Sequence, residues 1–281
     1  MFTLVAQNKY GEKLELTHNS AYVIKSIEGI DPPDAVINTT RNAGADGSMF
    51  NSSYVDNRII IITLAINAPV ESNRIQLYRY FKNKYAVRLY YKNDARDVYI
   101  DSYCRNMTIG FFDKKQIAQI TVECPEPFFN GSKDELVDFS SVQGCFEFPF
   151  AIETPIPFSE ILIDQEKTII NGGDVETGVE IYLRATGALS NPAVYCVDQS
   201  THFKLTLSME QGDEVYICTI QKRKKVLLTH DGVTTNIIGA LENGSTWFVL
   251  SPGDNIFMAS AETNPEYLEA YCIVRDQFEG V

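Results

Sequence analysis

Short apolar runs rich in β-branched and aromatic residues recur along most of the chain, and Gly, Asn, Asp and Pro separate them. This spacing predicts strands joined by turns, and therefore a mainly β protein. The clearest run is RIIIITLAI at 58–66, which is apolar on both faces at its centre. Such a run favours a central strand that is covered on both sides. Further strands are expected over 85–91, 98–107 and 116–124.

One segment has a helical period instead. In PVESNRIQLYRYFKNK, at 69–84, apolar side chains recur at three-residue intervals and cations fill the other face. This pattern predicts one amphipathic helix near 72–84, which packs its apolar stripe on the strands. Ser72 or Asn73 is the expected N-cap, because a short polar side chain there accepts a hydrogen bond from the first helical turn.

The second half shows no helical period, and its turn signals recur about every 10–20 residues, as in a β-sandwich. The runs EVYICTI at 214–220 and KVLLT at 225–229 flank QKRK at 221–224, which carries three cations. We interpret them as a hairpin with a solvated basic tip. The run STWFVL at 245–250 predicts a strand, with Trp247 packed in a core or interface rather than exposed as a platform for a sugar.

The segment CPEPFFNG, at 124–131, carries two prolines and an Asn-Gly turn, which end the first strand-rich part. We therefore expect a domain at 1–135 and a second at 136–281. The net charge of -13 falls almost wholly in the second half. Such a chain has too few cations to bind nucleic acid by counterion release, so no sequence-specific nucleic-acid partner is expected. The acidic surface aids solubility, or lines a passage that repels DNA.

Catalytic and metal-binding motifs are not visible in the sequence. His18, His202 and His230 are isolated, and no GxSxG, HExxH or Walker pattern occurs. The six cysteines form no CxxC pair, so we expect them to be reduced and buried. We expect no catalytic residue, no cofactor and no metal, and hence a protein that is not an enzyme. No secretory signal or membrane span is predicted, which implies a soluble product of the cytoplasm.

The stretch NTTRNAGADGSMFNSSY, at 38–54, is rich in small and polar residues. We predict a long loop there, and a loop of that length is usually functional. Our hypothesis is that it becomes ordered on contact with a neighbouring subunit. The candidate interface residues are Asp46, Gly47, Met49 and Phe50.

Short segments in a defined order carry a family resemblance. They are EGIDPPDA at 28–35, NTT at 38–40, GADG at 44–47, RIIII at 58–62, YRYF at 78–81, YIDSY at 99–103, FF at 128–129, WFVL at 247–250 and PGDN at 252–255. Together they resemble the distal tail proteins of long-tailed, siphovirus-type phages and prophages. The resemblance extends over nearly the whole chain and is stronger over residues 25–130.

The resemblance implies a first domain that is a tail-tube-like β-barrel or sandwich with one packed α-helix. It implies a galectin-like β-sandwich as the second domain. Six copies of such a protein would form a ring at the virion tail tip, the baseplate hub. The ring would join the tail tube protein to a tail-tip, tail-associated protein and to a receptor-binding protein, with no membrane partner.

Three alternatives stay open at this point. The second domain of a carbohydrate-binding tail-tip adhesin would show exposed aromatic residues on a sheet face. A tail-tube subunit would resemble the first domain alone. An enzyme that acts on the cell wall would need a catalytic constellation, which the sequence does not show.

Overall fold

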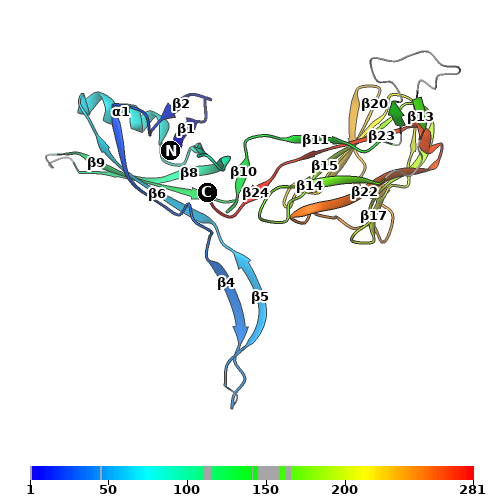
Figure 1. Cartoon of the computed structure of the whole chain (residues 1–281), viewed down its shortest axis with the longest axis horizontal. Helices are drawn as coiled ribbons and strands as arrows, with labels where there is room; N and C mark the ends of the chain where they lie inside the picture. The colour runs from blue at the N-terminus through cyan, green and yellow to red at the C-terminus, as the bar shows by residue number, and fades with distance from the viewer. Residues whose placement is uncertain (1, 45, 111–114, 141, 145–158, 162–165) are drawn as a thin grey trace. The chain divides into compact units, whose positions relative to one another are not determined.

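The computed structural model describes residues 2–44, 46–110, 115–140, 142–144, 159–161 and 166–281 (Figure 1). They form two compact units, the first containing Met1–Ser132 and Gln277–Val281 and the second containing Lys133–Asp276. The chain therefore passes between the units twice. This differs from the sequence-based division, which assigned all of 136–281 to one domain. The difference arises because β24 (Gln277–Phe278) pairs with β10 (Phe129–Gly131) in the first unit.

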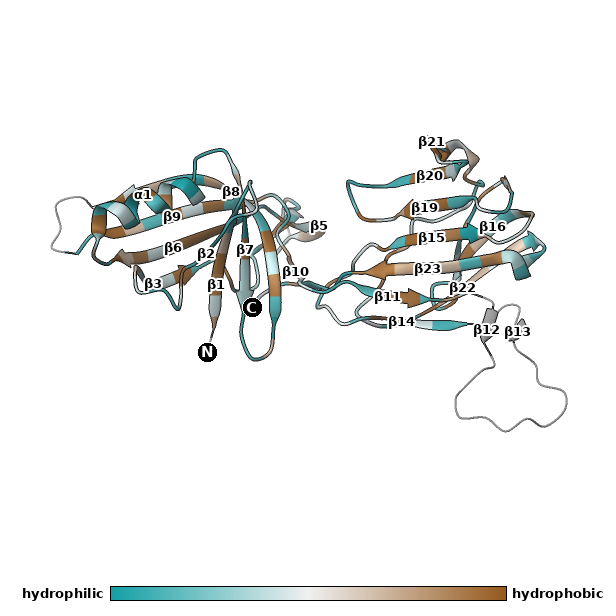
Figure 2. Cartoon of the chain, turned by 90° about the horizontal axis from the view of Figure 1, so that it is seen from above, coloured by the Kyte–Doolittle hydropathy of each residue, from teal (hydrophilic) through white to brown (hydrophobic). Residues whose placement is uncertain are grey.

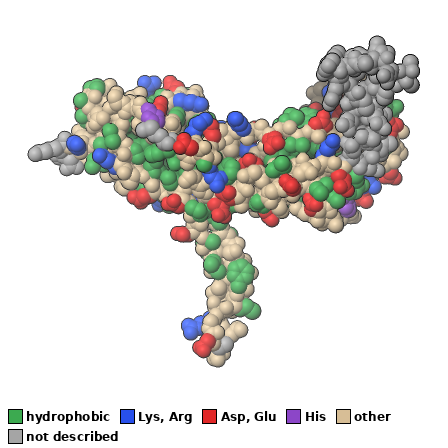
Figure 3. Space-filling view, viewed as in Figure 1, with side chains coloured by type: hydrophobic (Ala, Val, Ile, Leu, Met, Phe, Trp, Pro, Cys, Tyr) green, Lys and Arg blue, Asp and Glu red, His purple; other side chains and the backbone are tan. Residues whose placement is uncertain are grey.

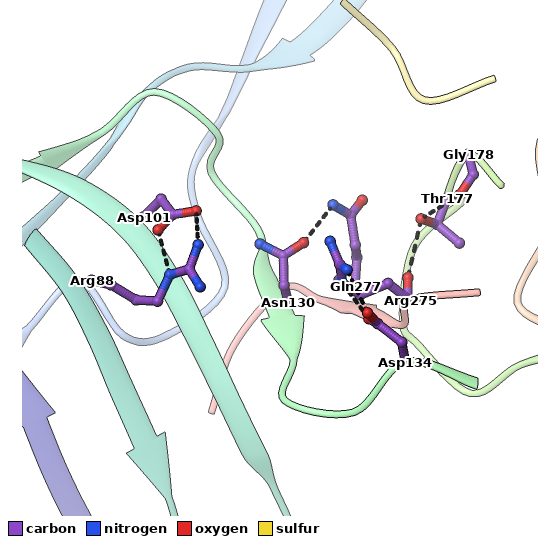
Figure 4. A network of polar contacts seen from close by, with 8 residues as sticks. All are labelled: Arg88, Asp101, Asn130, Asp134, Thr177, Gly178, Arg275 and Gln277. Atoms are coloured by element: carbon purple, nitrogen blue, oxygen red, sulfur yellow. Dashed lines mark hydrogen bonds and ion pairs between the residues drawn. The ribbon is translucent and has the colours of Figure 1, made fainter. Parts of the chain in front are cut away.

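The two passages of the chain are held by separate contacts (Figure 4). In the first unit, the side chain of Gln277 donates a hydrogen bond of 3.1 Å to Asn130. In the second unit, Arg275 forms a two-pronged ion pair with Asp134, at 2.6 and 2.7 Å. Each unit therefore fixes its own end of the double connection.

The first unit is built on one antiparallel sheet in the order β2-β1-β7-β8-β9-β6-β3, with β10 joined to β8. Its strands are β1 (Thr3–Asn8), β2 (Lys13–Glu15), β3 (Tyr22–Glu28), β6 (Arg58–Ile66), β7 (Ala86–Lys92), β8 (Asp97–Ile109) and β9 (Ile117–Cys124). Within the described residues, β2 and β3 are the two ends of this path and do not pair with each other. The barrel expected for the first domain is therefore not closed, because the ladder of hydrogen bonds stops at both edges.

Strand β6 spans the predicted residues and lies inside the sheet, between β9 and β3. Its inward side chains Ile60, Ile62 and Leu64 are at most 1% exposed. Its outward face is less covered than predicted, since Ile59 is 43% exposed.

The helix α1 (Val70–Tyr80) packs against β1 and β6, as predicted, but through Asn73 and Leu77. The predicted apolar stripe is wrong in part, because Ile75 and Tyr78 are 54% and 40% exposed. Its N-cap is Pro69, which makes no side-chain cap hydrogen bond, so neither Ser72 nor Asn73 has the predicted role. The Asn73 side chain instead donates to the carbonyl of Asn67 at 2.9 Å. The helix ends before residue 84 because Phe81 leaves the helical conformation and is only 2% exposed, within the core.

The second unit is a sandwich of two antiparallel sheets, as the family resemblance implied. One sheet has the order β11-β23-β15-β19-β20-β21 and the other β14-β22-β16-β17, with β18 on β16. The strands of these sheets are β11 (Glu135–Asp138), β14 (Lys167–Asn171), β15 (Glu180–Ala185), β16 (Leu189–Cys196), β17 (Thr201–Lys204), β18 (Ser208–Met209), β19 (Glu214–Cys218), β20 (Lys225–His230), β21 (Val233–Asn236), β22 (Gly253–Thr263) and β23 (Leu268–Val274). A separate pair is formed by β12 (Val142–Gly144) and β13 (Ser159–Ile161). Two 3-10 turns are η1 (Ile238–Ala240) and η2 (Pro265–Tyr267).

Side chains from both sheets form one core cluster in the second unit. Buried and less buried residues alternate along β19 and β23 of one sheet and along β22 of the other, so each sheet turns one face inward (Figure 2). The hairpin β19–β20 forms as predicted, and its basic tip at 221–224 is exposed. The segment 245–249 forms no strand, contrary to the prediction. Trp247 still packs on the core, edge-on to Phe203 with ring centroids 5.0 Å apart.

Candidate functional site: an exposed two-stranded arm

The predicted loop at 38–54 is in fact most of a β-hairpin. Strand β4 (Ala35–Thr40) pairs with β5 (Met49–Val55) from Ala35 opposite Val55 to Thr40 opposite Met49. Neither strand pairs with any other described strand. We call residues 35–55 the arm, and it projects from the sheet of the first unit (Figure 1). Its strands escaped prediction because both faces meet solvent, so no alternation of buried and exposed residues marks them.

Large apolar side chains are exposed along the whole arm. Ile37 is 63% exposed, Met49 58%, Phe50 62% and Tyr54 54%. Figure 3 shows hydrophobic surface along it. A lone two-stranded hairpin is only marginally stable in water, and clustered exposed apolar side chains mark interaction sites. The arm is therefore the candidate site for binding a partner.

The pairing register places apolar groups on both faces of the arm. Ile37 and Thr39 share a face by alternation, and Phe50 lies opposite Thr39. On the other face Tyr54 lies opposite Val36, and Met49 lies opposite Thr40. A partner that covered one face would leave the other in water. The arm is thus suited to insertion between surfaces rather than to resting on one.

The strands of the arm carry no charged side chain, since AVINTT and MFNSSYV contain no Asp, Glu, Lys or Arg. Exposed strand edges in soluble proteins are commonly protected from unwanted pairing by Lys or Pro. Charges here lie outside the strands, at the tip in Arg41 and Asp46. The backbone edges of the arm therefore remain available for pairing with another chain.

The structure places all four predicted interface residues on this arm. Asp46 and Gly47 lie in the tip, where Gly47 has a φ of +87° and a Cβ there would meet nothing within 4 Å. Met49 and Phe50 begin β5. Sequence reasoning missed Ile37 and Tyr54, because they lie in short polar-looking runs. That the four predicted residues form an interface stays a prediction.

The root of the arm is sterically specified. Gly29, just after β3, has a φ of +81°, and a Cβ there would lie 2.0 Å from the carbonyl oxygen of Ile59. A side chain at this position would collide with the backbone of β6. Glycine is thus required where the chain turns out of the sheet into the arm.

No described group of three His, Cys, Asp or Glu residues could hold a metal ion. Five cysteines are free and buried, and burial raises the pKa of Cys104 to about 11 and that of Cys272 to about 12. The thiols of Cys104 and Cys272 are therefore protonated and unreactive near neutral pH. Cys145 lies outside the described residues. None of the described helices has the length and apolar character needed to cross a membrane.

His18 and His230 are exposed, as expected. His18 borders an open groove of about 400 Å³ in the first unit, whose apolar lining residues include Phe2 and Val23. His230 has a specific partner, since its Nδ1 lies 2.6 Å from Oδ1 of Asp213. Hydrogen bonding to this carboxylate raises the pKa of His230 above its ordinary value.

A row of tyrosines crosses one sheet of the sandwich. Tyr271, Tyr182 and Tyr216 are directly paired on β23, β15 and β19. Tyr182 stacks on Tyr271 with centroids 4.7 Å apart and planes 4° from parallel. Tyr182 also contacts the ring of Tyr216, at 4.9 Å. Because the central ring has a neighbour on each side, its faces are not open to a sugar ring.

Two family models match the chain, one to each unit. The phage tail protein RIFT-related domain matches residues 9–124, and the C-terminal domain of the siphovirus-type tail component matches residues 172–271. Together they cover more than half of the sequence. No curated protein matches the chain.

Solved structures share the fold over the full length. The crystal structure of SPP1 Dit (gp 19.1), described as a paradigm of the hub adsorption apparatus in phages that infect Gram-positive bacteria, is similar with a TM-score of 0.70 and 13% identity over 99% of each chain. A chain of the phage P2 baseplate in its activated conformation with Ca is similar with a TM-score of 0.55 and 11% identity over 100% of each. At these identities the likeness establishes the fold alone.

The two-unit fold and the two matched domains define a structural protein of a phage tail. The chain belongs to the siphovirus-type tail components. This confirms the resemblance to phage distal tail, or baseplate hub, proteins. The family and fold are those of structural tail proteins rather than of known enzymes.

Proposed function

We propose that the chain assembles into a closed, hexameric ring at the tail tip and that the arm makes the contact between neighbouring copies. The observation that carries this proposal is the uncharged arm with four large apolar side chains that are more than half exposed. Burial of apolar surface contributes about 25 cal/mol per Å², which the arm can gain from another chain. The ring size of six is taken from the family resemblance.

The contact we propose is heterologous, because the arm of one copy would bind a different surface on the next. Heterologous contacts do not end in a dimer; they continue until a ring closes or a filament grows. A hub needs a closed ring, since it must leave a central passage. In the assembled tail, the ring would contact the tail tube protein on one side and the tail-associated and receptor-binding proteins on the other.

The acidic character of the second half fits this role. Residues 140–281 carry 8 Lys and Arg against 20 Asp and Glu. Such a surface repels phosphate, so DNA would leave the tail without adhering to it. It also leaves nucleic acid as an unsuitable partner.

The test of arm-mediated assembly is the solution mass from light scattering over a range of concentrations, with negative-stain imaging of the largest species. We expect a ring for the wild-type chain and monomers for the double variant Met49→Ser, Phe50→Ser and for deletion of 43–49. A matched control is Val233→Ser, which changes a 64% exposed apolar residue on β21 and should leave the ring intact.

Two results would contradict the proposal. One is an arm variant that forms rings as well as the wild-type chain does. The other is a wild-type chain that stays monomeric at every concentration, which would remove self-assembly by this chain alone. At a dilution at which the wild-type chain is monomeric, thermal unfolding of the variants should match it, because the arm contributes nothing to either core.

A carbohydrate-binding role is the second candidate, and the tyrosine row on β23, β15 and β19 is the observation that favours it. It ranks below the hub role because the mutual stacking of Tyr182 and Tyr271 occupies ring faces that a sugar would need. A glycan screen with the wild-type chain and with Tyr216→Ala tests it. Binding that the substitution abolishes would support the adhesin role, and no binding would remove it.

A further inference from the structure

Arg58 is a buried cation at the root of the arm. It is 4% exposed, although it begins β6 directly after the arm. Its guanidinium donates to the carbonyl oxygens of Gly29 and Asp31 from Nη1, both at 2.7 Å. It also donates from Nε to Pro127 at 2.5 Å and from Nη2 to Glu279. All four contacts lie within the first unit.

These four carbonyls belong to three segments that are distant in sequence. Residues 29–31 lead into β4, whereas Arg58 follows the end of β5, so one side chain joins both strands of the arm at their base. Pro127 precedes β10 and Glu279 follows β24. The same side chain therefore also binds next to the two strands at which the chain leaves the first unit and returns to it.

The chemistry of this site requires arginine. A buried charge is costly unless its donors are satisfied, and here four backbone oxygens satisfy a planar fork. The guanidinium of Arg58 lies over the ring of Phe129, with its Cζ 4.8 Å from the ring centroid. A lysine could place its ammonium in the site but could not reach carbonyls in four directions at once.

The last residues contact the root of the arm independently of Arg58. The backbone N–H of Val281 donates to the carbonyl of Ile30 at 3.2 Å. A Cβ on Gly280 would lie 2.9 Å from Cδ of Pro32, so the two backbones are in close contact. The segment 279–281 thus forms part of the base on which the arm stands.

We propose that Arg58 is the positioning residue of the arm and that residues 279–281 complete its anchorage. A chain is made from its N-terminus and its domains fold as units, so these last residues reach the root only after the second unit has been made. The anchorage of the arm is therefore complete only in a chain whose second unit has been made. This delays assembly until that point in synthesis. The consequence for assembly rests on the proposed role of the arm, whereas the anchorage does not.

The first test compares the full-length variants Arg58→Lys and Arg88→Lys by hydrogen–deuterium exchange of the monomer. Arg88 is the matched control because it makes a comparable forked contact, to Asp101 at 2.7 and 3.0 Å, on the surface of the same unit (Figure 4). Loss of hydrogen bonds to a charged donor should make exchange of the paired residues beside the root, 27–28, 35–36 and 54–55, and of the Val281 amide at least about tenfold faster in Arg58→Lys. Arg88→Lys should leave those amides unchanged.

The second test keeps Arg58 and ends the chain at Phe278. This removes the carbonyl of Glu279 and the contacts of Gly280 and Val281, and it should also speed exchange at 27–28, 35–36 and 54–55 while the sandwich core stays protected. It remains informative if Arg58→Lys does not fold. Root exchange equal to that of the wild type, in either folded variant, would overturn the proposal. Because exchange is read on monomers, this failure is distinguishable from a failure to form rings.

Discussion

The arm and the hairpin β19–β20 are both antiparallel two-stranded ribbons with exposed tips, yet their apolar side chains lie in opposite environments. In β19–β20, Val215, Ile217 and Val226 are fully buried, and β15 and β21 continue the sheet on both sides. Among the described residues of the arm none is buried, and no third described strand pairs with it. Both ribbons are paired along their strands, although the register of the arm shifts between Asn38 and Thr39, so pairing is not the main difference between them.

The difference lies in where each ribbon finds its apolar burial. The sandwich hairpin obtains it from the opposite sheet of its own unit, so it stabilises the monomer. The arm keeps side chains as large in water, so the free energy of burying them is available only on association. The same local structure thus serves folding in one place and, as we propose, assembly in the other.

The sharpest way to break this comparison is a pair of matched substitutions, Ile217→Ala and Ile37→Ala. Ile217 is 0% exposed, so removing its side chain leaves a cavity and should lower the free energy of unfolding by about 2–5 kcal/mol. Ile37 is 63% exposed, so the same change should stay within about 0.5 kcal/mol. Urea unfolding of both variants measures this. Similar losses would mean that the arm is packed in the monomer.

A smaller effect is expected from a matched pair of asparagines. Asn255 is 3% exposed, accepts from the backbone N–H of Ser251 and donates to its carbonyl, both at 2.8 Å. Asn255→Ala should lower the free energy of unfolding by about 1–3 kcal/mol, because it leaves buried backbone groups without partners. Asn38 on the arm bonds only to the exposed Ser52, at 3.1 Å. Asn38→Ala should be close to neutral. Scanning calorimetry of both variants measures the two effects.

The smallest expected effect is a pH dependence confined to the second unit. The pKa of His230 is raised in the folded state by its hydrogen bond to Asp213, so the pair stabilises the fold fully below about pH 6.5, the unfolded pKa of histidine. This contribution is lost as pH rises through the folded pKa. The difference in unfolding midpoint between wild type and His230→Gln should therefore shrink from about pH 6 to about pH 9. Deletion of 43–49 removes no histidine and should leave this dependence unchanged; a midpoint difference that grows with pH would refute the assignment.

The sequence was most informative where one face of an element is buried. The run 58–66 coincides with β6, and the hairpin β19–β20 follows its predicted residues closely. The helix near 72–84 was right in type but ends at Tyr80. The predicted N-cap was wrong, because the side chain of Asn73 donates its hydrogen bond to the carbonyl of Asn67. No capping pattern describes a contact between these two residues.

Prediction failed where the deciding partner is far away in the chain or lies outside it. The strands at 35–40 and 49–55 read as a loop, because side chains that face solvent on both sides leave no periodicity. The four candidate residues Asp46, Gly47, Met49 and Phe50 nevertheless lie on the arm, and their part in an interface stays a prediction.

By itself, the sequence determined a mainly β protein with one helix, a division near the two prolines of CPEPFFNG, and a tail-protein family. Alternating burial and turn chemistry are local properties, so they are visible in consecutive residues. Tertiary structure alone decided that the first sheet stays open, that residues 277–281 return to it, and that Arg58 gathers four carbonyls at the root of the arm. The physical reason is that these features depend on contacts between residues as many as 221 positions apart, to which no local pattern corresponds.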